Sequence, residues 1–203
     1  MKFPFFASFI VFCFWLGYEL HKQRNREAQN MEDFWEKETA ANQTRRQSLD
    51  ELNYITIPLD TLPMNILCED EQVKEYHETL RELAKEPIVN LTGISNTDLK
   101  LTYGAPNITL LSAYDQRYTH LARTLQSLAD ALYKNGYLQE ACDVLTFAVS
   151  THTDISASYK LLITLYQELG QEDKIPSLLP IAESLNSGMK NTIIRMIQDA
   201  CPD

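Results

Sequence analysis

Two stretches of the chain repeat one pattern, Leu125-Gln-Ser-Leu-Ala-Asp-Ala-Leu-Tyr-Lys-Asn-Gly136 and Tyr159-Lys-Leu-Leu-Ile-Thr-Leu-Tyr-Gln-Glu-Leu-Gly170. The second begins 34 residues after the first, so that Leu128 maps onto Leu162 and Gly136 onto Gly170. A period of this length, with two short amphipathic segments around a Gly-centred turn, is typical of stacked helical hairpins. One such hairpin cannot bury its apolar face alone. We therefore expect successive hairpins to pack against each other in a regular stack.

The region from Leu121 to Ser187 resembles the tetratricopeptide repeat (TPR) superfamily. The family pattern asks for a large residue, a Leu, a small residue, an aromatic or Leu, a turn Gly, and then Ala, a large residue and Ala. The first unit matches it at Leu125, Leu128, Ala129, Leu132, Gly136, Ala141, Leu145 and Ala148. The second unit departs from it, since Ile163 replaces the small residue and Ile175 replaces the first Ala. Pro180 should also kink the second helix of that unit.

The resemblance implies an all-α fold, a right-handed stack of helical hairpins, and an adaptor or scaffold role. In such modules a protein or peptide partner binds a groove lined by the first helix of each pair. Transferred by register, the candidates for partner binding are Arg123, Gln126, Asp130, Tyr133, Ala157, Lys160, Thr164 and Gln167. Their charges are mixed. The alternative is that these residues form a solvated face or pack against the chain's own N-terminal part.

Other segments of the body carry helical signals. Residues 69–85 form an amphipathic pattern with Val73, Tyr76, Leu80 and Leu83 on one face. A long stripe runs from Leu110 through Tyr114 and Tyr118 to Leu132, with a possible break at 115–117. Residues 190–200 should form a closing helix, and 88–105 fit either a short helix at 97–103 or a small hairpin. Two repeat units are fewer than the roughly three that a stable stack needs. We therefore expect 69–203 to fold as one helical TPR-like domain.

The N-terminus is apolar from Phe3 to Tyr18 apart from Ser8, with the first acid at Glu19. Extended to Leu20, this stretch approaches the roughly 17–25 residues of a spanning helix, which predicts a transmembrane anchor over 1–20. The rival is a cleaved signal peptide, but no small-residue cleavage site follows the apolar run. Residues 21–47 then form a juxtamembrane helical stalk, and 48–68, with two prolines, an extended connector. The positive residues after the anchor favour a single-pass membrane protein whose C-terminal body lies in the cytoplasm.

The acidic composition restricts the partners. The net charge is −10 over 203 residues, and residues 48–86 hold ten acids against three bases. Such a body offers no basic patch to neutralise phosphates, so we expect no nucleic-acid partner. The three cysteines after residue 20 have no paired spacing that would suggest a disulfide framework.

The sequence contains no recognisable centre of chemistry. The four histidines are scattered, no Gly-rich phosphate loop is present, and no nucleophile has an activating context. We therefore expect neither catalytic activity, nor a cofactor, nor a metal site.

The preferred hypothesis is a membrane-anchored TPR-like adaptor or scaffold for a protein partner. The alternative is a structural subunit of a membrane complex that assembles through its anchor and stalk. A third, an enzyme or its regulator with a site formed only in a complex, needs a pocket of perturbed ionisable groups.

Overall fold

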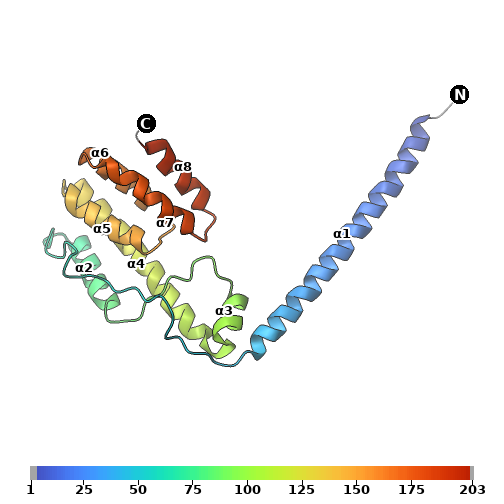
Figure 1. The fold of residues 1–203 in the computed structure, drawn as a ribbon, viewed down its shortest axis with the longest axis horizontal. Helices are drawn as coiled ribbons and strands as arrows, with labels where there is room; N and C mark the ends of the chain where they lie inside the picture. The colour runs from blue at the N-terminus through green and yellow to red at the C-terminus, as the bar shows by residue number, and fades with distance from the viewer. Residues whose placement is uncertain (1–3, 202–203) are drawn as a thin grey trace. The chain divides into compact units, whose positions relative to one another are not determined.

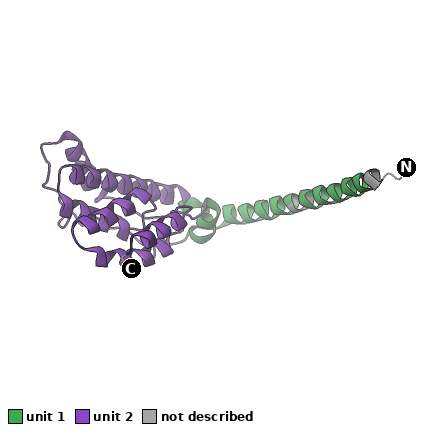
Figure 2. Cartoon of the chain, turned by 90° about the horizontal axis from the view of Figure 1, so that it is seen from above, with its two compact units in different colours: residues 1–47, 96–107 green, residues 48–95, 108–203 purple. Residues whose placement is uncertain are grey.

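The computed structural model describes residues 4–201, without the side chains of 4–7, 25, 26 and 28. This part of the chain contains eight α-helices, two 3-10 segments and no strand, so the all-α prediction is confirmed (Figure 1). The only strand-like feature in the described residues is an isolated antiparallel bridge between Tyr54 and Val89. Two compact units are distinguished by their internal contacts, residues 1–47 with 96–107 and residues 48–95 with 108–203 (Figure 2).

The first unit consists of α1 (Pro4–Gln43), α3 (Asn96–Tyr103) and the 3-10 segment η1 (Ala105–Asn107). The C-terminal end of α1 packs against α3 through polar contacts. Glu38 accepts hydrogen bonds from Lys100 and from the Thr97 hydroxyl. Lys100, followed by Thr97, holds the pKa of the Glu38 carboxyl below its usual value. The short-helix alternative for 97–103 is therefore the one that the chain adopts.

A buried asparagine closes the first unit. Asn107 is fully buried, and its Oδ1 accepts from Arg46 Nε at 2.9 Å. Its Nδ2 donates to the carbonyl oxygens of Gln47 and Tyr103, each at 2.8 Å. A buried amide is tolerated only when its hydrogen bonds are made, and here both ends of the amide are bonded.

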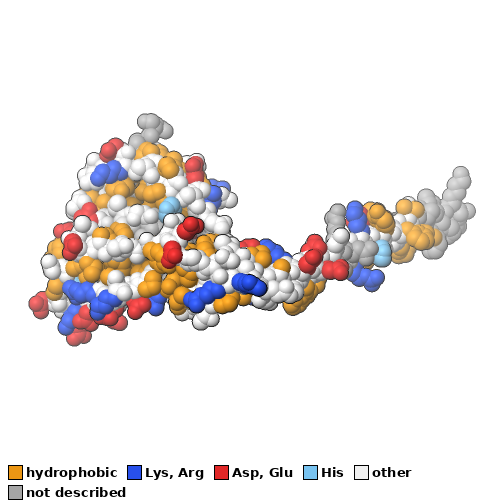
Figure 3. Space-filling model, turned by 60° about the horizontal axis from the view of Figure 1, so that its bottom comes forward, with side chains coloured by type: hydrophobic (Ala, Val, Ile, Leu, Met, Phe, Trp, Pro, Cys, Tyr) orange, Lys and Arg blue, Asp and Glu red, His pale blue; other side chains and the backbone are white. Residues whose placement is uncertain are grey.

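The N-terminal part of α1 exposes many apolar side chains. Phe9, Phe14 and Trp15, for example, are 56%, 77% and 56% exposed. Figure 3 shows apolar side chains, in orange, on the face of this helix that is in view. Among the residues that the structure describes, no helix is long and apolar enough to cross a membrane.

The transmembrane anchor predicted over 1–20 is therefore not supported by the structure. Part of it, residues 1–7, lies outside the described side chains. The uncharged run from Phe3 ends at Tyr18, because Glu19 follows it. It is a little shorter than the roughly 17–25 residues that a spanning helix needs.

The second unit is a stack of helices. Its first four helices are α2 (Glu71–Leu83), α4 (Ile108–Lys134), α5 (Leu138–Ser150) and α6 (Ser156–Glu168). The stack is completed by the 3-10 segment η2 (Glu172–Ser177) and by α7 (Leu178–Ser184) and α8 (Lys190–Ala200). In this stack α2 packs on α4, α4 on α5, α5 on α6, and α8 on both α6 and α7 (Figure 1). One continuous apolar core runs through it, and α8 buries Ile193 and Ile197 against its end. The predicted closing helix is thus confirmed.

The start of α2 coincides with a local sequence signal. α2 starts after Asp70, whose carboxylate accepts from the N–H groups of Gln72 and Val73 at 2.9 and 3.1 Å.

The chain continues through 115–117 as helix, so the break considered there does not occur. Leu111 is buried at the start of α4 and Leu110 is 37% exposed, which corrects the predicted stripe by one residue. The reason is the spacing, since Leu111 continues the 3–4 alternation from Tyr114 onward and Leu110 does not.

Both repeats close their first helix with the same turn. At the first turn, Tyr137 N–H donates to Leu132 O and Gly136 N–H donates to Tyr133 O, each at 3.0 Å. Equivalent bonds recur 34 residues later around Gly170. The φ angles of Gly136 and Gly170 are +81° and +65°, which only glycine adopts without strain. This paired bonding is the Schellman motif, and it turns the chain back onto the preceding helix.

The second repeat is less regular than the first. Its second helix is divided into η2 and α7. Pro176 lies inside η2, and Pro180 lies in the first turn of α7, where a missing N–H does no harm. Instead of a kink at Pro180, the chain ends η2 and begins a new helix, α7, at Leu178.

Candidate functional site

The predicted partner-binding residues lie on α4 and α6, the first helices of the two repeats. Two hydrogen bonds join these helices. Ser158 Oγ donates to Gln126 Oε1 at 2.6 Å, and Tyr133 OH donates to Glu168 Oε1 at 2.8 Å. The partners stand 32 and 35 residues apart, close to the repeat period. Residues at equivalent heights of successive repeats are thus in contact.

The candidates differ in how available they are to a partner. Gln126 and Tyr133 already use their polar atoms in the bonds between α4 and α6. Asp130 and Thr164 are half-buried, and Thr164 donates to the carbonyl of Lys160. The exposed candidates are Arg123, Ala157, Lys160 and Gln167. Partner binding on this α4/α6 face stays a prediction, and the exposed cations are the side chains on which it can be tested.

A second hollow lies between α2 and α4. It has a volume of about 410 Å³ and is lined by Glu75, Glu78, Glu82 and His120 among others. Glu82 is paired with Lys85, and nearby Glu86 is paired with Arg117. These ion pairs are exposed on at least one side and contribute little to stability.

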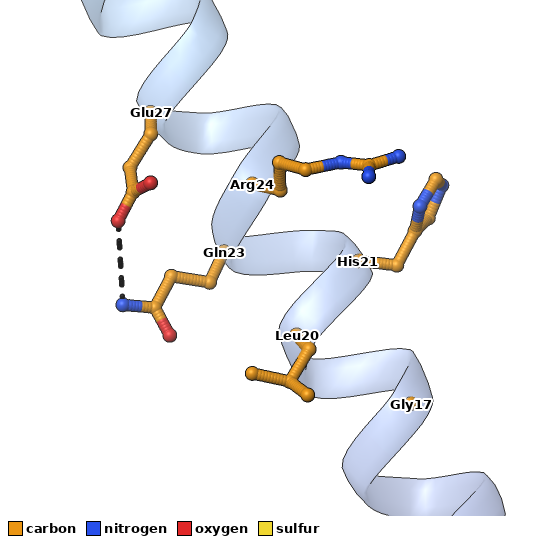
Figure 4. Close-up of a pocket in the computed structure, with 6 residues that line it drawn as sticks. All are labelled: Gly17, Leu20, His21, Gln23, Arg24 and Glu27. Atoms are coloured by element: carbon orange, nitrogen blue, oxygen red, sulfur yellow. Dashed lines mark hydrogen bonds between the residues drawn. The ribbon is translucent and has the colours of Figure 1, made fainter.

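A third hollow lies on α1 (Figure 4). Its six lining residues come from successive turns of one helix, and their side chains point in different directions. Gln23 Nε2 donates to Glu27 Oε1 at 3.4 Å. The lining side chains therefore do not converge on a common point.

A polar cavity of about 170 Å³ lies in the second unit. Three segments line it: residues 90–92, the α5–α6 turn at 152–154, and 184–187 after α7. We call it the loop cavity. It brings together side chains that are up to 97 positions apart in the sequence.

Several buried groups hold the α5–α6 turn in place. Tyr118 OH donates to Thr151 O at 3.2 Å, and Tyr159 OH donates to Thr153 O at 3.0 Å. Asn90 Nδ2 donates to the carbonyls of Thr151 and His152 at 3.0 and 3.1 Å. Burial raises the pKa of Tyr118 to about 12 and raises the pKa of Tyr159 as well. Both phenols therefore remain protonated donors at neutral pH.

These anchors keep His152 in an uncommon conformation. Its φ angle is +60°, in the left-handed region that costs a non-glycine residue roughly 1–2 kcal/mol. Strained residues of this kind cluster at functional sites. The backbone of the third segment is equally confined, because a Cβ on Gly93 would stand 1.8 Å from Asn186 O.

His152 and Ser184 connect the α5–α6 turn to the end of α7. Nδ1 of His152 lies 2.9 Å from Ser184 Oγ, and Ser184 Oγ lies 2.6 Å from Ile181 O.

Comparison with known protein families, with curated proteins and with solved structures finds no match to this chain.

The described side chains include no group of three or more His, Cys, Asp or Glu that could hold a metal ion. Sequence reasoning did not single out the loop cavity. His152 stood in the sequence as one of four scattered histidines, and Asp154 and Ser184 carried no signal. The only local hint was Gly93, whose role becomes visible once Asn186 is placed beside it.

Proposed function

We propose that this chain is a TPR-like adaptor that binds a protein partner on the α4/α6 face and attaches to a lipid membrane through its N-terminal segment. The observation that carries the proposal is the contact between the first helices of successive repeats, α4 and α6, through Gln126 with Ser158 and Tyr133 with Glu168. The identical glycine turns support it. The proposal includes no catalytic step.

The adaptor role can be tested by charge reversal on the exposed face. We expect the double change Arg123→Glu and Lys160→Glu to abolish recovery of a specific partner that the unaltered full chain retrieves from cells. The matched control is Lys74→Glu with Arg81→Glu, which reverses two exposed cations on α2 instead. Equal recovery by both double variants would contradict binding on the α4/α6 face.

Membrane attachment is supported by the character of the exposed segment. Between Phe9 and Leu20 the large apolar side chains are exposed in nearly every direction around α1, and the described stretch 9–18 contains no charge. An exposed apolar segment of this size marks a site of interaction with a protein or a membrane, and the lack of charge favours lipid because charged side chains are costly to insert. Trp15 and Tyr18 are side chains that favour the membrane interface.

Flotation with phosphatidylcholine vesicles tests this attachment. The full chain should float with the vesicles, and Phe12→Asp with Leu16→Asp should leave it at the bottom of the gradient. Phe34→Asp with Trp35→Asp serves as the control, because these aromatics stand outside the apolar run. Loss of flotation in the control alone would place the contact at 34–35 instead.

The second candidate function is a structural subunit that assembles through α1. Met31, Phe34 and Trp35 favour it, since they are 58%, 51% and 59% exposed in an otherwise charged segment. Under this alternative the full chain in detergent has a mass greater than that of one copy. The double change Phe34→Ser with Trp35→Ser reduces this mass to that of one copy. A mass of one copy for the unaltered chain, measured by light scattering, would remove self-assembly but leave the adaptor proposal intact.

A further inference from the structure

We propose that the contact between the C-terminal end of α1 and the segment 96–107 is an electrostatic latch, which opens without unfolding the helical stack and whose open form is favoured by salt. The latch lies within the first unit, drawn in green in Figure 2. It is formed by α3 and η1 on one side and by residues 37–47 on the other. The inference does not depend on the proposed function.

Each charged side chain of α3 meets an opposite charge on α1. Lys37 Nζ donates to Asp98 Oδ1 at 2.7 Å. Lys100 Nζ donates to Glu38 Oε1, and the Thr97 hydroxyl donates to Glu38 Oε2 at 2.7 Å. Both oxygens of the Glu38 carboxylate are therefore used in this contact.

Two backbone hydrogen bonds also cross the contact. Gln47 N–H donates to Tyr103 O at 3.0 Å, and Ala105 N–H donates to Thr44 O at 3.2 Å. The buried amide of Asn107 adds a third link, since its Nδ2 donates to Gln47 O. The two backbone N–H groups lose these partners when the contact opens, so their exchange with solvent reports on the latch directly.

Apolar burial contributes little to the latch. Among the described side chains of the first unit, Ala41 and Leu99 are the only buried hydrophobic ones. Neither belongs to the continuous core of the second unit. α3 has only eight residues, and an isolated helix of that length is unstable in water. Segments with few buried apolar contacts open at low free energy, so α3 should lose its structure when the latch opens.

The paired charges make the latch sensitive to ionic strength. Lys37 and Asp98 are 51% and 48% exposed, and Glu38 and Lys100 are each 19% exposed. Dissolved salt screens exposed charges over a distance that falls from about 10 Å at 0.1 M to about 3 Å at 1 M. The second unit is held by a large apolar core, which screening of charge does not weaken. Salt should therefore open the latch selectively.

Amide hydrogen exchange of the full chain in a non-ionic detergent tests the latch. The exchange is compared at about 20 mM and about 500 mM KCl, which changes the screening distance severalfold. Relative to amides of α5, the amides of α3, Gln47 and Ala105 should exchange about threefold faster at high salt, the size expected for screening partly exposed pairs. An equal change in α5, or no change in α3, would contradict an electrostatic latch.

Charge reversal and its repair show whether the ion pairs hold the latch closed. Glu38→Lys places two cations together and should speed the exchange of α3 at least about tenfold at low salt. Adding Lys100→Glu restores a pair of opposite charges, so exchange should return toward that of the unaltered chain. The matched control is Glu36→Lys, the same charge change at an exposed position of α1, and it should leave α3 unaffected.

Protection of the α5 amides shows in each variant that the helical stack remains folded. The proposal is overturned if Glu38→Lys leaves the exchange of α3 unchanged, or if α5 opens together with α3 in that variant. It is also overturned if the double variant exchanges as fast as Glu38→Lys alone.

Discussion

His77 lies on the buried face of α2, is only 2% exposed, and its Nε2 has no hydrogen-bond partner in the described structure. The sequence pattern placed Tyr76 on that face, but Tyr76 is half-buried and His77 takes the inner position. Burial, followed by the nearby Arg81 charge, lowers the pKa of His77 from its ordinary value of 6.5. The imidazole is therefore neutral in the folded chain at neutral pH.

This burial predicts a loss of stability in acid. Below pH 6.5 the unfolded chain protonates His77 and the folded chain does not, so the free energy of unfolding falls as the pH falls. His77→Leu should remove that dependence, and at pH 7 it should be neutral or stabilising because an unpaired buried group costs about 1–3 kcal/mol. Urea unfolding at several pH values measures this, with exposed His120→Leu as the control. A His77→Leu chain that is clearly less stable at pH 7 would refute the idea.

Glycines with similar φ angles should respond differently to substitution. Gly93→Ala places a Cβ 1.8 Å from Asn186 O, whereas a Cβ on Gly136 meets nothing within 4 Å. Gly136→Ala should therefore cost only the backbone strain of roughly 1–2 kcal/mol, and Gly93→Ala clearly more. Thermal unfolding of both variants gives the comparison. Equal losses of stability in the two variants would mean that the loop around Asn186 moves to accommodate the added Cβ.

At the scale of elements, the start of α2 shows how one side chain sets a helix boundary. Asp70 accepts from two N–H groups that the first turn would otherwise leave unpaired. Asp70→Ala should lower the free energy of unfolding by about 1 kcal/mol. Denaturant unfolding measures this, and exposed Asp60→Ala, which caps no helix, is the control. An unchanged midpoint for Asp70→Ala would show that packing on α4 alone fixes the helix.

The same scale shows where local patterns predict well. The helix at 69–85, the long helix ending before Gly136 and the closing helix at 190–200 each follow from apolar spacing with Gly or Pro nearby. The slip from Tyr76 to His77 arises because both positions fit a 3.6-residue period between Val73 and Leu80, so that packing against α4 decides which of them is buried. At the start of α4 the strict 3–4 alternation already favours Leu111 over Leu110.

At the scale of the whole molecule, the apolar core is continuous from Ile57 and Val73 through the repeats to Ile197. Stacked hairpins stabilise one another only through their neighbours. We therefore predict that the second unit, which holds 69–95 and 108–203 of the expected domain, unfolds as one cooperative unit in the full chain. Hydrogen exchange should give similar opening free energies for buried amides in α2, α5 and α8. Early, separate exchange of α2 and its neighbours up to residue 110 would contradict this.

The sequence by itself determined the all-α class, the 34-residue period and most helix ends, because these depend on spacing and on the backbone preferences of Gly, Pro and Asp within a few residues. Only the tertiary structure decided the loop cavity, the burial of His77 and the bonding of Asn107. Each depends on segments far apart in the chain, as where Asn186 Nδ2 donates to Gly93 O across 93 positions. No local sequence pattern predicts such a contact, because the contact forms only after the helices have stacked.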